Sequence, residues 1–414
     1  MKNQVLVAQL GARKHYQEPL LFHRHGMLDK LYTDFYFGHE EVNKLLENTG
    51  VYNHLPSGVK KYLERSEPEL ENATIIQFPL FGYLYKQTLE KVSPEDQPRV
   101  FIWAGKEFCQ KIIKRGIGKA NIIYGFNSAC LELFQWAKKQ NIYCILDQTL
   151  ADYSLVNKIL LQEEKSWKDW SLSPFTINKN DVELMEREHE EQDLADRIIC
   201  GSGFVKNSLI VRGVSADKIK VIPLGRLKQE DKVNSPRVNS SLRKGGEKLN
   251  ILFGGTVGLR KGIPYLLEAL RQIEGVIPFN CKIVGSIEIQ SQRIAQYSDL
   301  CEFTGRIPRS EMGDLYRWAD VFVLPSLAEG SAMVTYEALS LGIPIITTDN
   351  SGSLVRDGID GFIIPPRNIT AIVEKLLYFY ENERQVSPIK EAESYLSHIF
   401  NESQRKLIEL ISHR

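Results

Sequence analysis

The chain has 414 residues with 52 basic and 52 acidic side chains, so its formal net charge is zero, and 43% of its residues are hydrophobic. That length and composition predict a globular protein of two domains, each with a sizeable core. The balanced charge creates no global field that would favour nucleic acid or an anionic membrane. We therefore expect no nucleic-acid partner.

Six cysteines show no paired metal-ligand spacing and mostly lie in apolar runs, as reduced core thiols do. The apolar run at residues 4–8 is too short for the core of a signal peptide, and no apolar run approaches the ~18 residues of a membrane span. We therefore expect a cytoplasmic protein. The cysteines are Cys109, Cys130, Cys144, Cys200, Cys281 and Cys301.

Short β-type runs alternate with longer helical stretches, which predicts parallel sheets covered by helices on both faces. In the first half the predicted strands are residues 5–8, 74–77, 121–124, 143–147, 197–200 and 220–223. In the second half they are residues 250–253, 281–284, 302–304, 321–324, 343–347 and 362–364. We expect an α/β protein with two Rossmann-like domains, residues 1–226 and 249–389.

Residues 227–248 are rich in Lys, Gln, Asn, Ser and Gly and contain Pro236 and the pair Gly245-Gly246. With little apolar periodicity, this stretch is interpreted as a linker or a long exposed loop. The last stretch, about residues 390–414, has the periodicity of an amphipathic helix.

Two carboxylates, Glu329 and Glu337, lie around a strand-to-helix junction. The β-rich run 321–324 precedes them, and an apolar helical run at 332–341 ends before Gly342. We therefore expect Glu329 and Gly330 at a helix N-terminus. Unpaired N–H groups near Gly330 and Ser331, together with the positive end of the helix dipole, suit a pyrophosphate.

If the segment from Glu329 to Glu337 were helical throughout, the two carboxylates would lie about 12 Å apart along the axis, at ~1.5 Å per residue. Glycosidase acid/base pairs lie only ~5 to 9.5 Å apart. The glutamates are therefore interpreted as separate contacts, one to a sugar and one to a ribose. The alternative interpretation is two solvated helix charges.

Several motifs within residues 249–366 resemble those of the retaining glycosyltransferases of family 4, which have the two-domain GT-B fold. They are Phe253-Gly254-Gly255 through Arg260-Lys261-Gly262, the loop Phe303-Thr304-Gly305-Arg306-Ile307, the pair Glu329 and Glu337, and Gly358-Ile359-Asp360-Gly361-Phe362-Ile363-Ile364-Pro365. The resemblance implies transfer of a sugar from a nucleoside diphosphate sugar to a hydroxyl acceptor, with retention of configuration. It also implies two domains that face each other across a cleft.

Arg260 and Lys261 follow a predicted strand and precede a helix, so their charges can neutralise a diphosphate leaving group. The alternative for both is a solvated loop pair. By the family pattern, Glu329 holds sugar hydroxyls, so the catalytic candidates are Glu329, Lys261 and Arg260. The candidate donor-binding residues are Gly255, Thr256, Arg306, Ile307, Gly330, Ser331 and Glu337.

The resemblance also implies individual roles for some of these donor-binding residues. By the family pattern, Glu337 binds the ribose, and the backbone at Arg306 and Ile307 faces the base, so the base itself is not revealed. Thr256 stands where the family usually has an arginine, for which Arg260 can compensate.

The loop from Gly11 to Tyr16 follows the first strand and resembles the glycine-rich loop that lies near the reacting centre in the family. Many relatives carry a histidine where this chain has Asp147. The candidate acceptor or sugar contacts are therefore Gly11, His15, Tyr16 and Asp147. The alternatives are a basic surface loop and, for Asp147, a turn cap.

No metal site is expected, because the histidines lack metal-ligand spacing and no paired-aspartate motif occurs. The family pattern also suggests that the C-terminal helix packs back on the first domain. The aromatic run 77–85, near Lys60, Lys61 and Lys86, is interpreted as core or acceptor-pocket packing, with peripheral contact to the inner face of a membrane as the alternative. The alternative functions are a nucleotide-sugar 2-epimerase and a non-catalytic nucleotide-sugar-binding partner subunit.

Overall fold

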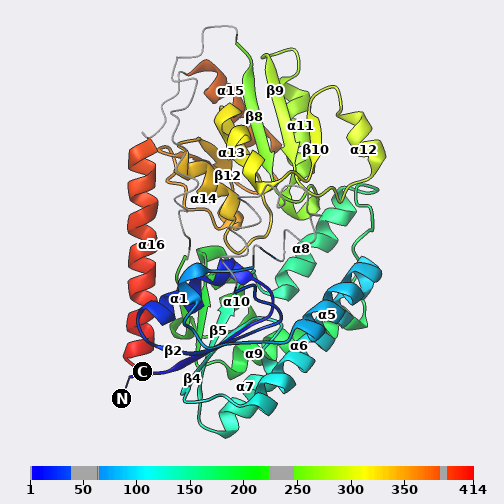
Figure 1. The fold of residues 1–414 in the computed structure, drawn as a ribbon. Helices are drawn as coiled ribbons and strands as arrows, with labels where there is room; N and C mark the ends of the chain where they lie inside the picture. The colour runs from blue at the N-terminus through cyan, green and yellow to red at the C-terminus, as the bar shows by residue number, and fades with distance from the viewer. Residues whose placement is uncertain (1, 39–62, 64, 224, 226–246, 383–388) are drawn as a thin grey trace, which may run out of the picture.

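The computed structural model describes residues 2–38, 63, 65–223, 225, 247–382 and 389–414. Two α/β domains are stacked on one another, and the C-terminal helix α16, Ile389–Ser412, runs along the side of both (Figure 1). The two chain termini lie together at the far end of the first domain. Except for residues 247 and 248, the predicted linker 227–248 lies outside the described residues, as do Lys60 and Lys61.

The first domain contains a fully parallel sheet of order β3-β2-β1-β4-β5-β6-β7. Its strands are β1 Val5–Gln9, β2 Leu28–Thr33, β3 Ile75–Gln77, β4 Ile122–Phe126, β5 Tyr143–Gln148, β6 Arg197–Cys200 and β7 Ile219–Val221. Its helices are α1 Gln17–Arg24, α5 Pro79–Lys91, α6 Gln97–Arg115, α7 Leu131–Lys139, α8 Tyr153–Ser166, α9 Lys179–Leu194 and α10 Gly203–Arg212.

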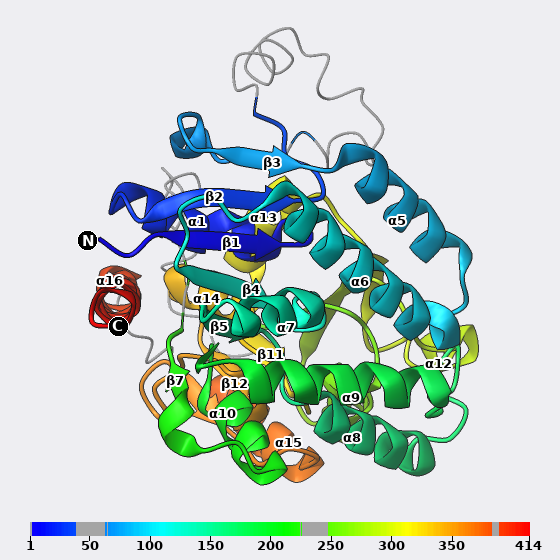
Figure 2. The ribbon, with the colours of Figure 1, turned by 90° about the horizontal axis from the view of Figure 1, so that it is seen from below.

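Both faces of this sheet are covered, as the sequence predicts for a parallel sheet. In β1, Leu6 and Ala8 belong to a core formed with α6, α7 and α10, whereas Val5 and Val7 belong to one formed with α1 and the end of α16. Figure 2 shows α5, α6, α7 and α9 along one side of the strands and α16 on the other. Leu407 and Ile411 anchor α16 there.

The strand β2, Leu28–Thr33, was not predicted from the sequence. Its first half contains Asp29 and Lys30, which are poor strand formers and stay partly exposed. Pairing with β1 and β3 determines this strand, and neither contact is visible in the local pattern. The other strands lie within a few residues of their predicted places.

The second domain contains a fully parallel sheet of order β10-β9-β8-β11-β12-β13. Its strands are β8 Leu249–Gly254, β9 Phe279–Val284, β10 Glu302–Gly305, β11 Val321–Leu324, β12 Ile345–Thr347 and β13 Gly361–Ile363. Its helices are α11 Ile263–Ile273, α12 Ser291–Gln296, α13 Arg309–Trp318, α14 Met333–Ser340 and α15 Ile369–Glu381. Short 3₁₀ helices lie at Leu259–Lys261 (η6) and Asp349–Ser351 (η7).

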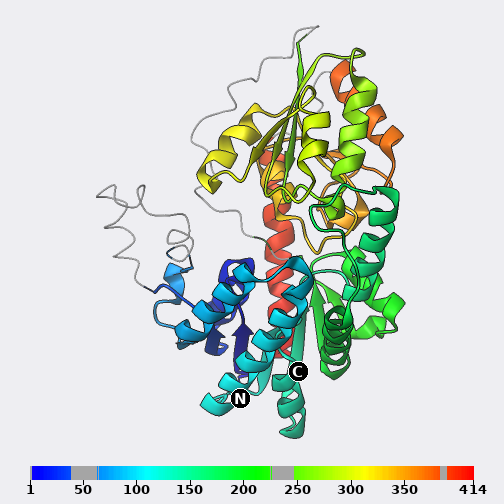
Figure 3. The same cartoon turned by 90° about the vertical axis from the view of Figure 1, so that its right-hand side faces the viewer.

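The core of the second domain includes side chains from outside it. Val156 and Ile159 of α8, and Leu396 and Phe400 of α16, belong to the same buried cluster as its strands. In Figures 1 and 3, α8 lies between the two domains, and α16 spans them. Two helices therefore join the domains by apolar packing.

The segment after α8 extends this contact. The N–H of Leu172 donates to the carbonyl of Glu288 at 2.9 Å, and the N–H of Gln290 donates to the carbonyl of Trp170 at 2.7 Å. Ser171 and Ile289 form an antiparallel bridge between these two bonds. Residues 153–172 thus belong to the first half in sequence and pack on the second domain.

Among the described residues, no helix has both the length and the apolar character required to cross a bilayer. All six cysteines are buried free thiols.

Candidate functional site

The carboxyl-end edges of the two sheets meet between the domains. A Cβ atom added to Gly330, in the loop after β11, would lie 1.8 Å from the carbonyl oxygen of Thr149, which follows β5. A Cβ atom added to Gly201, after β6, would lie 2.1 Å from Oγ of Ser331. The loop 329–331 of the second domain therefore touches the edge where parallel sheets bind ligands.

On the second domain, three predicted catalytic side chains lie together. Nη1 of Arg260 lies 2.7 Å from Oε1 of Glu329, and Nζ of Lys261 lies 2.8 Å from the same oxygen. Two cations on one carboxylate leave a net positive charge at the carboxyl end of the sheet. Such a cluster is chemically suited to an anion such as a diphosphate.

Burial affects the charge state of this cluster. Lys261 and Glu329 are each only 8% exposed, whereas Arg260 is partly open to solvent. Burial lowers the pKa of Lys261, and the charge of Glu329 opposes that effect. The carboxylate of Glu329 therefore helps to keep the buried lysine charged.

Backbone geometry places the two cations. Gly262, directly after η6, has φ +71°, and a Cβ atom there would lie 2.1 Å from the carbonyl oxygen of Pro325. The carbonyl of Arg260 accepts a hydrogen bond from the N–H of Leu327 at 2.9 Å. The turn that carries Arg260 and Lys261 is thus fixed against the loop after β11, and only glycine fits at position 262.

The prediction that Glu329 and Gly330 lie at a helix N-terminus is wrong. The helix α14 begins at Met333, and both residues belong to the preceding loop. The N–H of Glu329 donates to the carbonyl of Asn350 at 2.9 Å, because this loop packs on the segment around η7. That N–H group is therefore already paired and unavailable to a phosphate.

Four of the remaining predicted donor contacts follow strands of the second sheet, and Glu337 lies in a helix. Gly255 and Thr256 follow β8, and Arg306 and Ile307 follow β10. Glu337 lies within α14, where Oε2 accepts a hydrogen bond from the hydroxyl of Tyr316 at 3.0 Å. Their binding roles stay predictions.

Glu288, in the loop after β9, is a neighbour of this site that the sequence did not reveal. Its Oε2 lies 3.1 Å from the position of a Cβ atom on Gly258. Burial raises the pKa of Glu288, against the charges of Arg260 and Arg306, which lower it. The carboxyl group therefore lies within the electrostatic reach of both arginines.

The first domain has a cavity of about 470 Å³ at the carboxyl ends of β1, β4 and β5. Its lining combines cations, aromatic rings and a buried carboxyl group. The lining residues include Leu10, Arg13, Lys14, Tyr85, Phe101, Asn127, Thr149, Tyr153 and Glu188. A pocket of this size at this edge suits a small ligand.

The four predicted acceptor residues are not among the side chains that line this cavity. Tyr16 is buried in the core and donates a hydrogen bond to the carbonyl of Phe35 at 3.1 Å, and His15 is exposed. The N–H of Gly11 donates to Oδ1 of Asp34 at 2.9 Å. The predicted loop reaches the cavity, but through its other members, Arg13 and Lys14, and a binding role for the four stays a prediction.

Asp147 is fully buried at the end of β5 and pairs with the loop. Its Oδ2 lies 2.6 Å from Nζ of Lys14 and accepts a hydrogen bond from the hydroxyl of Tyr124 at 2.6 Å. Nζ of Lys14 also lies 3.0 Å from Oε1 of the buried Glu18. Asp147 therefore orients Lys14 at the cavity wall, an arrangement not among its predicted roles.

These ion pairs hold a strained stretch of backbone. Lys14, His15 and Tyr16 have φ values of 46°, 50° and 60°, in the left-handed region. Residues other than glycine pay about 1–3 kcal/mol for such a conformation, which persists only where the surroundings enforce it. The Lys14 ion pairs provide that enforcement.

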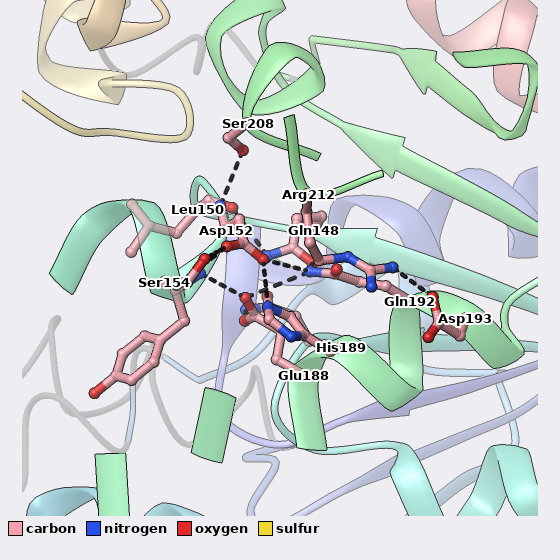
Figure 4. Close-up of polar contacts among 12 residues, drawn as sticks. Gln148, Leu150, Asp152, Ser154, Glu188, His189, Gln192, Asp193, Ser208 and Arg212 are labelled. Atoms are coloured by element: carbon pink, nitrogen blue, oxygen red, sulfur yellow. Dashed lines mark hydrogen bonds and ion pairs between the residues drawn. The ribbon is translucent and has the colours of Figure 1, made fainter. Parts of the chain in front are cut away.

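A polar network around Asn127 and Glu188 forms part of the cavity wall. Glu188 accepts hydrogen bonds from Nδ2 of Asn127 at 2.9 Å and from the N–H of Tyr153 at 2.8 Å. Figure 4 shows Gln192 beside Glu188, where its Nε2 also reaches Oδ2 of Asp152 at 3.3 Å. Burial raises the pKa of Glu188 to about 7, against the hydrogen bonds that lower it.

Sequence reasoning did not identify Phe101, Asn127, Tyr153 or Glu188 as site residues. The available signals were the cations beside His15 and the aromatic run that contains Tyr85. Among the described residues, no group of three or more His, Cys, Asp or Glu side chains is placed to hold a metal ion.

Residues 235–395 match the family model described as glycosyl transferases group 1. The chain is 27% identical over 199 residues to the amylovoran biosynthesis glycosyltransferase AmsK of Erwinia amylovora, which covers 44% of this chain and 47% of that protein. It is 28% identical over 196 residues to the uncharacterized glycosyltransferase MJ1178 of Methanocaldococcus jannaschii, covering 46% and 51%. The chain thus spans about half the length of the curated relatives it matches.

Solved structures resemble the whole fold. The Anabaena protein HepE in complex with UDP superposes with a TM-score of 0.59 at 17% identity over 100% of both chains. The lipopolysaccharide outer core galactosyltransferase WaaB superposes with a TM-score of 0.56 at 14% identity over 99% of both. The predicted GT-B fold is confirmed.

Proposed function

We propose that this protein is a glycosyltransferase that moves a sugar from a nucleoside diphosphate sugar to a hydroxyl group of an acceptor. The observation that carries the proposal is the cluster of Arg260, Lys261 and Glu329 at the carboxyl end of the second sheet. The match of residues 235–395 to glycosyl transferases group 1 supports it.

The donor diphosphate binds at this cluster. As the bond to the sugar breaks, negative charge grows on the leaving diphosphate, and Arg260 and Lys261 stabilise it. Glu329 fixes both cations and contacts the sugar hydroxyls, and Glu337 contacts the ribose. HepE was solved with UDP, so a uridine diphosphate sugar is the first donor to test.

The reaction proceeds with retention of configuration and without a divalent metal, as in glycosyltransferase family 4. The two cations take the part that a metal ion plays beside a diphosphate in other enzymes. Closure of the domains excludes water that would otherwise hydrolyse the donor. Turnover that survives excess EDTA and gives a product of unchanged anomeric configuration supports both points.

The protein works at the inner face of a membrane, in peripheral contact. The helix α5 buries Phe81, while Leu80 and Tyr83 on its outer face are 73% and 57% exposed. These apolar side chains favour the interface of a bilayer. Cosedimentation with anionic vesicles that is lost in Leu80→Ser supports this placement, and equal recovery of both proteins in the supernatant contradicts it.

The first experiment is a thermal-shift screen of UDP, GDP and ADP sugars on the wild type, on Lys261→Ala and on Lys248→Ala. Lys248 is an exposed lysine of the same domain and serves as the matched control. We expect one donor to raise the melting temperature of the wild type and the control, because a ligand that binds only the folded state stabilises it. Stabilisation of all three proteins alike would contradict the site.

Turnover separates this proposal from its alternatives. Transfer or slow hydrolysis of the donor supports a transferase. Conversion of the donor to its 2-epimer without an acceptor would favour an epimerase, and donor binding without any turnover would favour a non-catalytic partner subunit.

A further inference from the structure

The cavity of the first domain has an unequal distribution of charge. The Arg13 guanidinium donates to two neutral oxygens over long distances, 3.3 Å to the carbonyl of Leu10 and 3.4 Å to Oδ1 of Asn127. Within the described part of the chain, no carboxylate lies within 4.0 Å of it. A guanidinium normally finds a carboxylate or phosphate partner when it is partly buried.

The other charged groups of the cavity already have partners. The charge of Lys14 is met by Asp147 and Glu18 behind the cavity wall. Both oxygens of Glu188 accept hydrogen bonds from the protein, from Asn127 and from the backbone of Tyr153. Among the described side chains that line the cavity, Arg13 is therefore the charged one that lacks a charged partner.

The position of the cavity connects it to the donor loop. Thr149 lines the cavity, and its carbonyl oxygen is the atom against which the backbone of Gly330 packs. Gly330 directly follows Glu329 of the cationic cluster. A ligand in the cavity is thus separated from the donor loop by one residue.

We propose that this cavity binds the acceptor, that the acceptor is a saccharide carrying a carboxylate or a phosphate, and that Arg13 recognises this anionic group. The identification of the ligand as an acceptor rests on the transferase function proposed above. The volume of about 470 Å³ lies in the range of small-ligand pockets. The rings of Tyr85, Phe101 and Tyr153 offer apolar surfaces to the sugar.

The test uses two pairs of probes that differ in one group. p-Nitrophenyl β-D-glucuronide and p-nitrophenyl β-D-glucoside differ in a carboxylate, and glucose 6-phosphate and glucose differ in a phosphate. Isothermal titration calorimetry in the presence of UDP measures their binding to the wild type, to Arg13→Gln and to Arg99→Gln. Arg99 is an exposed arginine on α6 of the same domain and serves as the matched control.

In the wild type and in Arg99→Gln, we expect the anionic member of at least one pair to bind about tenfold more tightly than the neutral member, as about 1.4 kcal/mol from a charge-assisted contact provides. In Arg13→Gln this preference disappears. The pair that responds shows whether the anion is a carboxylate or a phosphate.

Equal binding within both pairs, binding of no probe, or a preference that persists in Arg13→Gln would overturn the proposal. Hydrolysis and binding of nucleotide sugars, measured separately, distinguish failure of this proposal from failure of the proposed transferase function. If UDP-sugar hydrolysis persists without an anionic preference, the transferase function stands and the acceptor assignment falls. If the preference is present while every nucleotide sugar fails to bind, the cavity stands and the transferase function falls.

Discussion

The hydroxyl of Tyr265 in the second domain donates a hydrogen bond to Oε2 of Glu163, which lies 2.7 Å away on α8. Nε of Arg367, also in the second domain, lies 2.5 Å from Oε1 of the same carboxylate. Glu163 is fully buried, so this carboxylate from the first half of the chain has its partners in the second domain.

Removing the Glu163 carboxylate should destabilise the fold. We expect Glu163→Ala to lower the free energy of unfolding by about 2–4 kcal/mol, because the Tyr265 hydroxyl and the partly exposed Arg367 lose their partner. Tyr265→Phe should cost about 1 kcal/mol. Urea denaturation measures both, with the exposed Lys158→Ala on the same helix as control. A Glu163→Ala protein as stable as the control would contradict this account.

Breaking the cationic cluster should abolish catalysis without unfolding the protein. We expect Lys261→Ala and Glu329→Ala each to reduce kcat at least about 100-fold. The first removes a preorganised cation at the leaving group, and the second removes the carboxylate that fixes both cations and contacts the sugar. Initial rates with the identified donor measure the effect, and circular dichroism checks the fold. A fully active Glu329→Ala enzyme would disprove the assignment of this site.

A methyl group at Gly330 should force the domain edges apart. Its Cβ would lie 1.8 Å from the backbone oxygen of Thr149, so the clash is with main-chain atoms and not with a movable side chain. We expect Gly330→Ala to reduce transfer at least about tenfold, because misplacement of reacting groups by even 1 Å is costly, while UDP still binds. In Gly201→Ala the added Cβ clashes with the movable Ser331 hydroxyl and reaches main-chain atoms only at 3.7 Å, so the effect should be smaller.

The control for this series is Gly203→Ala, where an added Cβ has no neighbour within 4 Å. Its rate should equal that of the wild type. Equal rates for Gly330→Ala and Gly203→Ala would show that the two edges do not need to touch during the reaction.

The buried carboxyl of Glu188 should make stability depend on pH. Its pKa is raised from 4.5 to about 7, so between these values the folded protein binds more protons than the unfolded chain. Stability therefore falls as pH rises through this window, by about 1–3 kcal/mol for this group. Unfolding free energies measured at pH 5, 6, 7 and 8 should show the decline.

Substitution of Glu188 tests whether this carboxyl group causes the pH dependence of stability. Glu188→Gln should reduce the slope, although Glu18 and Glu191, whose pKa values burial also raises to about 7, keep part of it. The exposed Glu186→Gln on the same helix should leave the slope unchanged. An identical slope in Glu188→Gln and the wild type would refute the attribution.

Much of the fold was predictable because buried parallel strands are continuous apolar runs, and the residues after such runs lie at one edge of the sheet. That logic places Arg260, Lys261 and Glu329 at this edge, and the resemblance to family 4 glycosyltransferases implies their roles. It failed where long-range packing decides the structure. The N–H of Glu329 pairs with Asn350 from a later loop, and no local pattern reveals this.

The cavity of the first domain depends even more on long-range packing that local sequence patterns do not reveal. Arg13, Tyr85, Asn127 and Glu188 come from four separate segments, and no pattern along the chain shows that they meet. Asp147 stands out in the sequence as a departure from the family pattern. Its ion pair with Lys14, however, depends on a left-handed turn that the sequence does not predict.

The packing of residues 153–172 on the second domain affects how this protein can be recombined. A chimera cut between the two sheets would leave Val156, Ile159 and Trp170 on the wrong parent, and the donor domain would lose part of its core. A transplantable donor module therefore consists of two discontinuous pieces of chain. Exchange of α8 and the segment that follows it, together with the second domain, keeps these three side chains with the donor core.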